Sequence, residues 1–213
     1  MSLKAAMETV LVVGATGNIG VSAVTAALRS KRNVLAIVRN QNSADKLVKY
    51  IGSSEGITFA EANVLSDSGR SPPASYAPTL TSPSKPTSGY HWLSARTIGY
   101  LLEQNYPAST WTICSGSQGD LATHPVPAMT QGALFPMATA AARENESTNV
   151  RFNEIYLGYR VEVDEVAAQN GTTKASDFGK VYELILANPE VRSSRVRVDD
   201  LEDLRKLKYQ RKF

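Results

Sequence analysis

The sequence has too little cysteine and histidine to build a disulfide or a typical metal centre. It contains one cysteine, Cys114, and two histidines, His91 and His124. A single cysteine cannot form an intramolecular disulfide, and common zinc sites combine several cysteine and histidine ligands. We therefore predict that the protein binds no metal.

Long hydrophobic runs and a strong excess of one charge are also missing. No apolar run approaches the about 20 residues that a helix needs to cross a bilayer. The N-terminal residues lack the small-residue cleavage site of a signal peptide. The net charge of +3 is too small to indicate a nucleic-acid-binding protein. These absences predict a cytoplasmic protein that binds neither membrane nor nucleic acid. They are compatible with a monomer and with a homo-oligomer.

The remaining composition is that of an ordinary globular protein. Hydrophobic residues make up 42% and charged residues 20% of the 213 residues, a balance typical of folded soluble domains. A chain of this length can form one domain with a substantial core. We therefore predict that residues 1–213 form a single domain.

The N-terminal residues alternate between apolar strands and an amphipathic helix. Residues 9–13 and 33–38 are almost wholly apolar and rich in valine and isoleucine, as in strands buried on both faces of a parallel sheet. Between them, Val21, Val24 and Leu28 recur at helical spacing. This βαβ pattern predicts an α/β fold with a doubly wound, Rossmann-type parallel sheet.

Further segments continue the alternation. We predict additional strands at 57–60, 110–114, 150–156 and 194–198, and helices at 44–50, 94–104, 130–144, 175–187 and from 200 onward. In the last helix, Asp199 and Asp200 suit the N-terminus, and the basic residues of 204–213 would form a solvated face.

Residues 68–93 interrupt this pattern. Half of the prolines lie between Pro72 and Pro86 with serines among them, and acidic residues are missing between Asp67 and Glu103. Neither helical nor strand periodicity is visible. Such a composition is typical of a loop or a disordered insert. We predict that it replaces the fourth-strand region of the sheet, either as a native insert or as a damaged segment.

A glycine-rich loop follows the first predicted strand directly. Gly14, Gly17 and Gly20 are spaced to allow a tight turn, the close approach of a pyrophosphate and close packing of the helix on the sheet. The helix N-terminus would face the phosphate charge. We predict that a dinucleotide is bound by this loop and by the ends of the next two strands, through Gly14, Thr16, Gly17, Asn18, Ile19, Arg39, Asn40, Asn63 and Val64.

The end of the second strand favours NADP(H) over NAD(H). NAD-preferring sites place an aspartate or glutamate there to bind the ribose 2′-hydroxyl, whereas this sequence has Arg39 and Asn40. An acidic side chain would repel a 2′-phosphate, and a guanidinium can bind one with two hydrogen bonds. We therefore predict NADP(H) as the cofactor.

Four motifs in this order resemble the short-chain dehydrogenase/reductase superfamily. The loop in VLVVGATGNIG (10–20) is most similar to its atypical, NmrA-like members. TICSGSQG (112–119) resembles the strand and loop with the catalytic serine. QGALFPMATAAARE (131–144) resembles the active-site helix, and VRFNEIYLG (150–158) resembles the strand after it. The resemblance implies an NAD(P)-dependent oxidoreductase.

The same resemblance implies a degenerate active site. The superfamily uses a tyrosine and a lysine four residues apart, and the register of the helix places Pro127 and Gln131 at these positions. Proline has no proton to donate, and an amide cannot lower the pKa of a neighbouring phenol as an ammonium does. The serine is either Ser115 or Ser117, because the spacing does not decide between them.

Two functions are compatible with these motifs. The first is an NAD(P)H-dependent oxidoreductase that transfers a hydride to a small carbonyl or alkene substrate. Ser115 or Ser117 would stabilise the oxyanion, and Tyr156 or Tyr159 would supply a proton. The second is a catalytically inactive NADP(H)-binding sensor, or a non-redox biosynthetic relative. The missing tyrosine and lysine favour the second function, and the serine loop favours the first.

Overall fold

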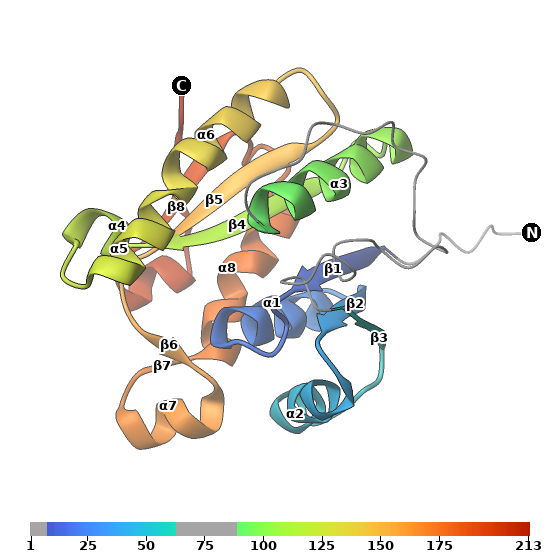
Figure 1. Ribbon diagram of the computed structural model, residues 1–213, viewed down its shortest axis with the longest axis vertical. Helices are drawn as coiled ribbons and strands as arrows, with labels where there is room; N and C mark the ends of the chain where they lie inside the picture. The colour runs from blue at the N-terminus through green and yellow to red at the C-terminus, as the bar shows by residue number, and fades with distance from the viewer. Residues whose placement is uncertain (1–7, 63–88) are drawn as a thin grey trace, which may run out of the picture. The chain divides into compact units, whose positions relative to one another are not determined.

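The computed structural model describes residues 8–62 and 89–213, which form two compact units (Figure 1). In the described part, the N-terminal unit contains 8–62 and Val161–Glu183, and the C-terminal unit contains 89–160 and Leu184–Phe213.

Some of the predicted site residues and most of the predicted insert are not among the residues that the structure describes. Asn63, Val64 and residues 68–88 of the predicted insert lie outside the described residues. The last residues of that predicted insert are helical, because helix α3 begins at Gly89 rather than near Ser94.

The N-terminal unit contains a three-stranded parallel sheet of order β1-β2-β3. Its elements are β1 (Thr9–Val13), α1 (Asn18–Arg29), β2 (Asn33–Val38), α2 (Gln41–Ile51) and β3 (Ile57–Glu61). Val12 is paired with Ala36 in the register of β1 and β2, and both are buried. Parallel neighbours need a crossover, and α1 and α2 provide it. The α/β prediction for these residues is confirmed.

Two further segments complete this unit. Strands β6 (Val161–Glu162) and β7 (Thr173–Lys174) pair in parallel and flank helix α7 (Asp164–Asn170). Helix α8 (Ala175–Ala187) begins in this unit and ends in the C-terminal unit. It packs closely on α1 at Gly179, where a Cβ would lie 3.0 Å from the Ser22 carbonyl oxygen.

The C-terminal unit contains a four-stranded sheet of order β4-β5-β8-β9. Strands β4 (Thr110–Gly116), β5 (Arg151–Leu157) and β8 (Ser194–Val198) are parallel, and β9 (Lys208–Arg211) is antiparallel to β8. Because the carboxyl ends of parallel strands meet at one edge, Gly116, Leu157 and Val198 bring their following turns together.

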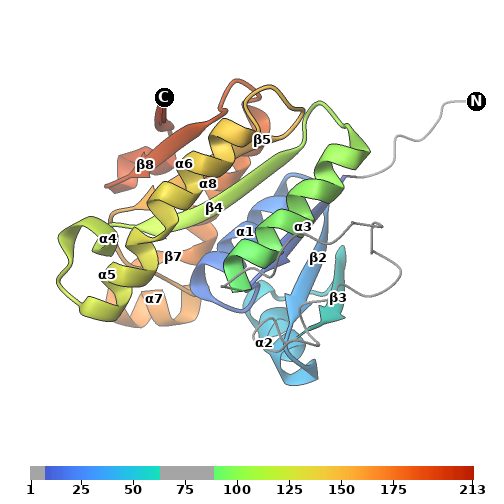
Figure 2. The ribbon, with the colours of Figure 1, turned by 45° about the horizontal axis from the view of Figure 1, so that its top comes forward.

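Helices α3 (Gly89–Gln104) and α6 (Leu134–Glu144) cover one face of β4 and β5 (Figure 2). Ile113 and Phe152 from the strands are buried against Ala138 and Ala142 of α6. Trp111 stacks on Phe152 with ring centroids 4.5 Å apart. This apolar contact fixes α6 and the loop before it.

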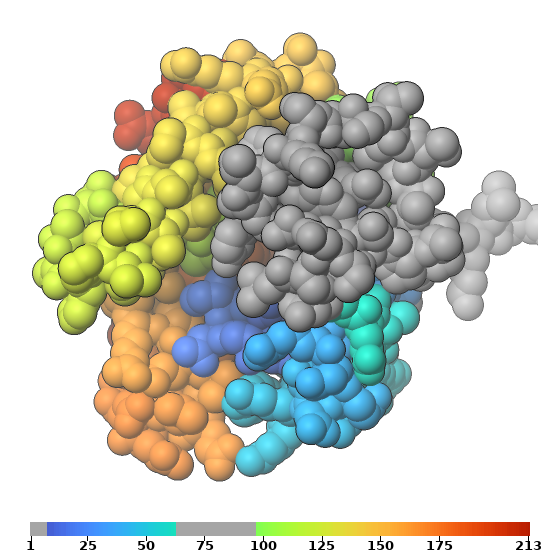
Figure 3. Space-filling model, in the orientation of Figure 1, coloured from blue at the N-terminus to red at the C-terminus, as the bar shows by residue number. Residues whose placement is uncertain are grey.

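Between β4 and α6 lie two short helices, α4 (Gln118–Leu121) and α5 (Pro125–Gly132). The prediction of one helix over 130–144 is therefore wrong at its start. Pro125 begins α5, where a missing amide hydrogen has no cost, and the helix ends at Gly132 before α6 begins. The surface of α4 and α5, yellow-green in Figure 3, exposes Leu121, Val126 and Met129.

The predicted helix from residue 200 onward is also wrong. The chain forms a 3-10 helix, η3 (Leu201–Leu204), and then strand β9. The polar sequence of β9 has no strand pattern of its own, and it is extended because it pairs with β8. Among the described helices, none is long and apolar enough to span a membrane.

Candidate functional site

The glycine loop forms a tight turn between β1 and α1. Gly14 has φ +70°, a left-handed conformation that favours glycine. The Gly17 amide donates a hydrogen bond to the Gly14 carbonyl oxygen at 3.0 Å, and Gly17 caps α1. The predicted loop is therefore a compact turn, and it places the N-terminus of α1 directly after the carboxyl end of β1.

The glycines of this loop have different requirements. A Cβ on Gly20 would lie 2.1 Å from the Gly14 carbonyl oxygen, so the chain itself needs glycine there. A Cβ on Gly17 would meet that same oxygen at 3.4 Å, an ordinary contact, and Gly17 has extended φ and ψ of −81° and 163°. The described part of the chain therefore does not need glycine at position 17, and among the described residues only the Gly14 carbonyl oxygen lies near the place of a Cβ.

The N-terminus of α1 suits an anion. Its first turn contains no acidic residue, so its amide groups and dipole are not neutralised by a neighbouring carboxylate. Thr16 and Ile19 are half-buried in the turn. The side-chain oxygen of Asn18 accepts a hydrogen bond from the Val163 amide at 3.2 Å, so this predicted ligand residue also fixes the start of α7.

Arg39 and Asn40 follow β2 as predicted, but they differ in their contacts. Asn40 caps α2, and its side-chain oxygen accepts hydrogen bonds from the amide and the hydroxyl of Ser43, both at 3.0 Å. Arg39 is exposed. Within the described ranges, its guanidinium makes no ion pair, so it is available to an anionic ligand.

The two candidate serines lie at the end of β4 and differ in accessibility. Ser115 is 4% exposed, and its hydroxyl donates to Glu154 Oε1 at 2.6 Å. Ser117 is half-buried and begins the turn into α4. Its amide donates to the Leu157 carbonyl oxygen at 2.9 Å, which fixes it beside the end of β5. Of the two serines, Ser117 is therefore the more exposed.

Glu154 is a buried charge that the sequence analysis missed. Its carboxylate is fully buried on β5, and its Oε2 is 3.1 Å from Arg195 Nε and 2.6 Å from Lys212 Nζ. Two cations and the Ser115 hydroxyl therefore compensate one buried carboxylate. A glutamate within the mostly apolar strand RFNEIYL is the signal that could have identified it.

Tyr156 and Tyr159 follow Glu154 near the end of β5. The Tyr156 ring is 5% exposed and contacts Arg197, whose guanidinium carbon is 4.7 Å from the ring centroid. Burial and the adjacent Asp120 carboxylate raise the pKa of Tyr156. Burial and the Asp203 and Asp200 carboxylates raise the pKa of Tyr159 to about 12. Both phenols are therefore protonated at neutral pH.

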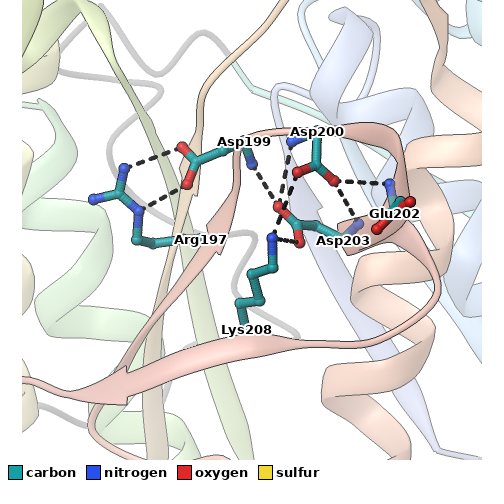
Figure 4. Close-up of polar contacts among 6 residues, drawn as sticks. All are labelled: Arg197, Asp199, Asp200, Glu202, Asp203 and Lys208. Atoms are coloured by element: carbon teal, nitrogen blue, oxygen red, sulfur yellow. Dashed lines mark hydrogen bonds and ion pairs between the residues drawn. The ribbon is translucent and has the colours of Figure 1, made fainter.

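The turn after β8 is held by the buried carboxylate of Asp203 (Figure 4). Its Oδ2 accepts hydrogen bonds from the amides of Asp199 at 2.9 Å and Asp200 at 3.3 Å, and its Oδ1 is 2.6 Å from Lys208 Nζ. Burial raises the pKa of Asp203, but the contacts with Lys208 and the two amides outweigh burial and lower it.

The lowered pKa of Asp203 predicts acid sensitivity of folding. A carboxyl group whose pKa is lower in the folded state stabilises the fold above its unfolded pKa of about 3.9, and this contribution is lost as the pH falls through the folded value. We expect Asp203→Asn to lower the free energy of unfolding by about 1–3 kcal/mol at neutral pH. Urea denaturation from pH 7 down to pH 3 should show the difference shrinking below about pH 4.

Glu202→Gln is the matched control for this prediction, because Glu202 is an exposed carboxylate in the same turn. We expect it to leave the free energy of unfolding within about 0.5 kcal/mol of that of the unmodified protein. A difference between Asp203→Asn and the unmodified protein that stays constant across the pH range would contradict the assignment.

The described residues contain no group of three or more histidine, cysteine, aspartate or glutamate side chains placed to hold a metal ion.

Pro127 and Gln131 both lie on α5, one helical turn apart. The side chain of Gln131 packs against Gly116 at the end of β4.

Comparisons with known proteins agree with these features. A model of the NmrA-like family matches residues 6–102. Short-chain dehydrogenase/reductase iacG of Pestalotiopsis fici is 41% identical over 240 residues, which cover 96% of this chain and 96% of that protein. The alignment is longer than the 213 residues of this chain, so the relative contains residues that this chain lacks.

Solved structures show the same fold. A short-chain dehydrogenase/reductase (glucose/ribitol dehydrogenase) from Brucella melitensis matches with a TM-score of 0.65 and 18% identity, covering 90% of this chain and 94% of that one. A variant of actinorhodin polyketide ketoreductase with NADPH matches with a TM-score of 0.68 and 13% identity, covering 90% and 95%.

The parallel sheets and the glycine turn define a Rossmann-type, nucleotide-binding α/β protein. The chain belongs to the short-chain dehydrogenase/reductase family, a family of NAD(P)(H)-binding oxidoreductases, and its N-terminal half is NmrA-like. The predicted family and fold class are confirmed.

Proposed function

We propose that this protein is an NADP(H)-dependent oxidoreductase that reduces a carbonyl or an activated alkene of a small molecule, with Ser117 as the group that stabilises the developing oxyanion. The observation that supports it most is the glycine at position 17. It lies at the N-terminus of α1, and the packing of the described residues does not require a glycine there. A cytoplasmic location belongs to the same proposal.

The residues of the glycine turn would hold the pyrophosphate. Gly17 leaves room for it, and the amides at the start of α1 face its charge. Arg39 would bind a 2′-phosphate. It is exposed directly after β2, at the position where an NAD-preferring site has an aspartate or glutamate. The bound cofactor supplies the hydride.

Ser117 is a better donor to the oxyanion than Ser115. Ser115 is buried and its hydroxyl donates to Glu154, whereas the hydroxyl of Ser117 donates a long hydrogen bond of 3.4 Å to the Gly158 carbonyl oxygen. A hydrogen bond to the developing charge is one of the larger contributions to catalysis. Tyr156, a protonated phenol beside Asp120, is the proposed source of the proton.

A second function is favoured by Pro127 and Gln131. They take the positions of the family's tyrosine and lysine in the register of the active-site helix, and neither can transfer a proton. A protein that binds NADPH without reducing anything, such as a sensor, would need neither residue. Calorimetric titration with NADPH, combined with NADPH oxidation in the presence of ketones, aldehydes and enones, separates the two functions. Binding without turnover would support the sensor.

Arg39→Asp is expected to weaken NADPH binding about 10- to 100-fold more than NADH binding, because a charge-assisted pair with the 2′-phosphate becomes a repulsion. Calorimetric titration of both cofactors measures the ratio. Lys46→Asp is the control, since Lys46 is an exposed cation on α2 of the same unit. Equal losses for NADPH and NADH in Arg39→Asp would show that Arg39 does not select the cofactor.

A further inference from the structure

The N-terminal unit contains a cavity that lies away from the glycine turn. Its volume is about 310 Å³, and all the residues that line it belong to this unit. The lining comes from helices α1, α2, α7 and α8 and includes Leu28, Arg29, Tyr50, Ile51, Asp164 and Ser176. Leu28 and Arg29 are at the C-terminal end of α1, roughly 16–18 Å along the helix axis from Gly17. The cavity is therefore separate from the predicted pyrophosphate site.

Polar contacts between the helices hold the walls of this cavity. Arg29 Nη1 on α1 donates to the Ser176 carbonyl oxygen on α8 at 2.7 Å, and the Ser176 amide donates to Asp164 Oδ1 on α7 at 2.9 Å. Lys49 on α2 pairs with Glu165 on α7 at 3.6 Å, one residue away from the lining on each helix. These contacts join all four helices, so the cavity is a preformed part of the unit, as small-molecule sites usually are.

Two opposite charges line the cavity without forming an ion pair with each other. Arg29 and Asp164 contact the carbonyl and the amide of the same residue, Ser176, and within the described ranges Asp164 makes no ion pair. Arg29 Nη1 is also 3.6 Å from Glu183 Oε1. Among the described residues, neither Asp164 Oδ2 nor the Nε and Nη2 atoms of Arg29 have a hydrogen-bond partner. An acceptor and several donors are therefore left for a ligand.

The size and the other walls of the cavity restrict that ligand. Leu28 and Ile51 are apolar and half-buried, and Tyr50 adds an aromatic ring. Small-molecule sites usually have volumes of about 300–1,000 Å³, so this cavity is at the lower end of the range. It suits a molecule of the size of an amino acid rather than a second dinucleotide.

We propose that this cavity binds a small zwitterion of the α-amino acid class with an apolar side chain. Arg29 would bind the carboxylate, Asp164 would bind the ammonium group, and the side chain would lie against Leu28 and Ile51. Asp164 disfavours a phosphate or a simple carboxylate, and Arg29 disfavours a simple amine. The inference is independent of the proposed oxidoreductase function, because it uses no residue of the glycine turn or of the serine turn.

Three probes that differ by one charged group test this inference on the full chain. L-Leucine has both charges, 4-methylpentanoate lacks the ammonium group, and 3-methylbutylamine lacks the carboxylate. In amide NMR titrations, L-leucine should shift the signals of the lining residues, with a dissociation constant of about 1 mM or lower. Each of the other two probes should bind at least about 10-fold more weakly, because one charge-assisted contact is lost.

Two variants assign the charged groups of the probe to their partners. Arg29→Gln should weaken the binding of L-leucine about 10-fold or more and should not weaken that of 3-methylbutylamine. Asp164→Asn should weaken L-leucine by a similar factor and should not weaken 4-methylpentanoate. Lys180→Gln and Asp45→Asn are the matched controls, because these exposed residues lie on α8 and α2 outside the lining, and they should change nothing.

The inference is wrong if L-leucine at millimolar concentration leaves the lining amides unshifted, or if the three probes bind the unmodified protein equally well. It is also wrong if the control variants lose as much affinity as Arg29→Gln and Asp164→Asn. Melting temperatures check that each variant is folded, and the comparison of probes on the unmodified protein decides the matter if a variant is not. NADPH titration of the same samples tests the proposed function separately.

Discussion

Gly17→Val is expected to abolish NADPH binding, with at least a 100-fold loss of affinity, while the protein remains folded. The valine side chain would occupy the space beside the N-terminus of α1 that the pyrophosphate needs. The fold should tolerate it, because Gly17 has an extended backbone conformation that valine adopts readily. Calorimetry measures the loss, and circular dichroism checks the fold.

Gly20→Ala provides the contrast within the same loop. Its Cβ would lie 2.1 Å from the Gly14 carbonyl oxygen and 2.7 Å from the Ala15 Cα, and neither backbone atom can move cheaply. This smaller substitution should therefore disrupt the turn and lower the melting temperature strongly. Unchanged NADPH affinity in Gly17→Val, measured on folded protein, would show that the glycine turn is not the pyrophosphate site.

Glu154→Gln should strongly destabilise the C-terminal unit, lowering the free energy of unfolding by about 3–5 kcal/mol. The substitution keeps the shape of the side chain but leaves Lys212, which is 6% exposed, without its counter-charge. An uncompensated buried charge accounts for most of this cost. Urea denaturation at neutral pH measures it.

Glu146→Gln is the matched control for the buried carboxylate. Glu146 pairs with Arg211 at 2.9 Å, but both side chains are more than half exposed, at 53% and 57%. Exposed pairs contribute about 0–1 kcal/mol, so this change should be nearly silent. Similar losses for the two variants would mean that the burial of Glu154 does not determine its importance.

Elements defined by local apolar patterns could be predicted to the residue. The strands 9–13, 33–38 and 194–198 and the helix 175–187 have the same bounds in the structure. Each is bounded by glycine or polar residues, and within β2 and β8 buried residues alternate with more exposed ones. For these segments, local preference and tertiary environment agree, so the sequence alone predicts where each element begins and ends.

The elements that were missed depend on contacts between distant residues. The extended state of Lys208–Arg211 comes from pairing with β8, which the polar sequence KYQR does not indicate. The break between α5 and α6 is associated with the close packing of Gly119 on Gly132. Neither cause is visible in a window of neighbouring residues.

In the candidate site, too, features set by neighbouring residues could be predicted, and features set by distant contacts could not. The glycine spacing identified the turn between β1 and α1 because its requirement for small residues is local. The proposal of Ser117 rather than Ser115 depends on a contact across strands, since the Glu154 carboxylate that accepts from the Ser115 hydroxyl is 39 positions away in the chain. Spacing alone could not reveal that hydrogen bond.

Strand β9 has a consequence for how the protein behaves in concentrated solution. An exposed sheet edge offers unpaired backbone groups to which another chain can add a strand, and this is a common route to aggregation. All four residues of β9 are exposed, and the strand contains Lys208 and Arg211, which form ion pairs with Asp203 and Glu146. A second molecule that added its strand here would bury these charged side chains and disturb their ion pairs. The charged residues of β9 therefore disfavour the addition of another strand at this edge.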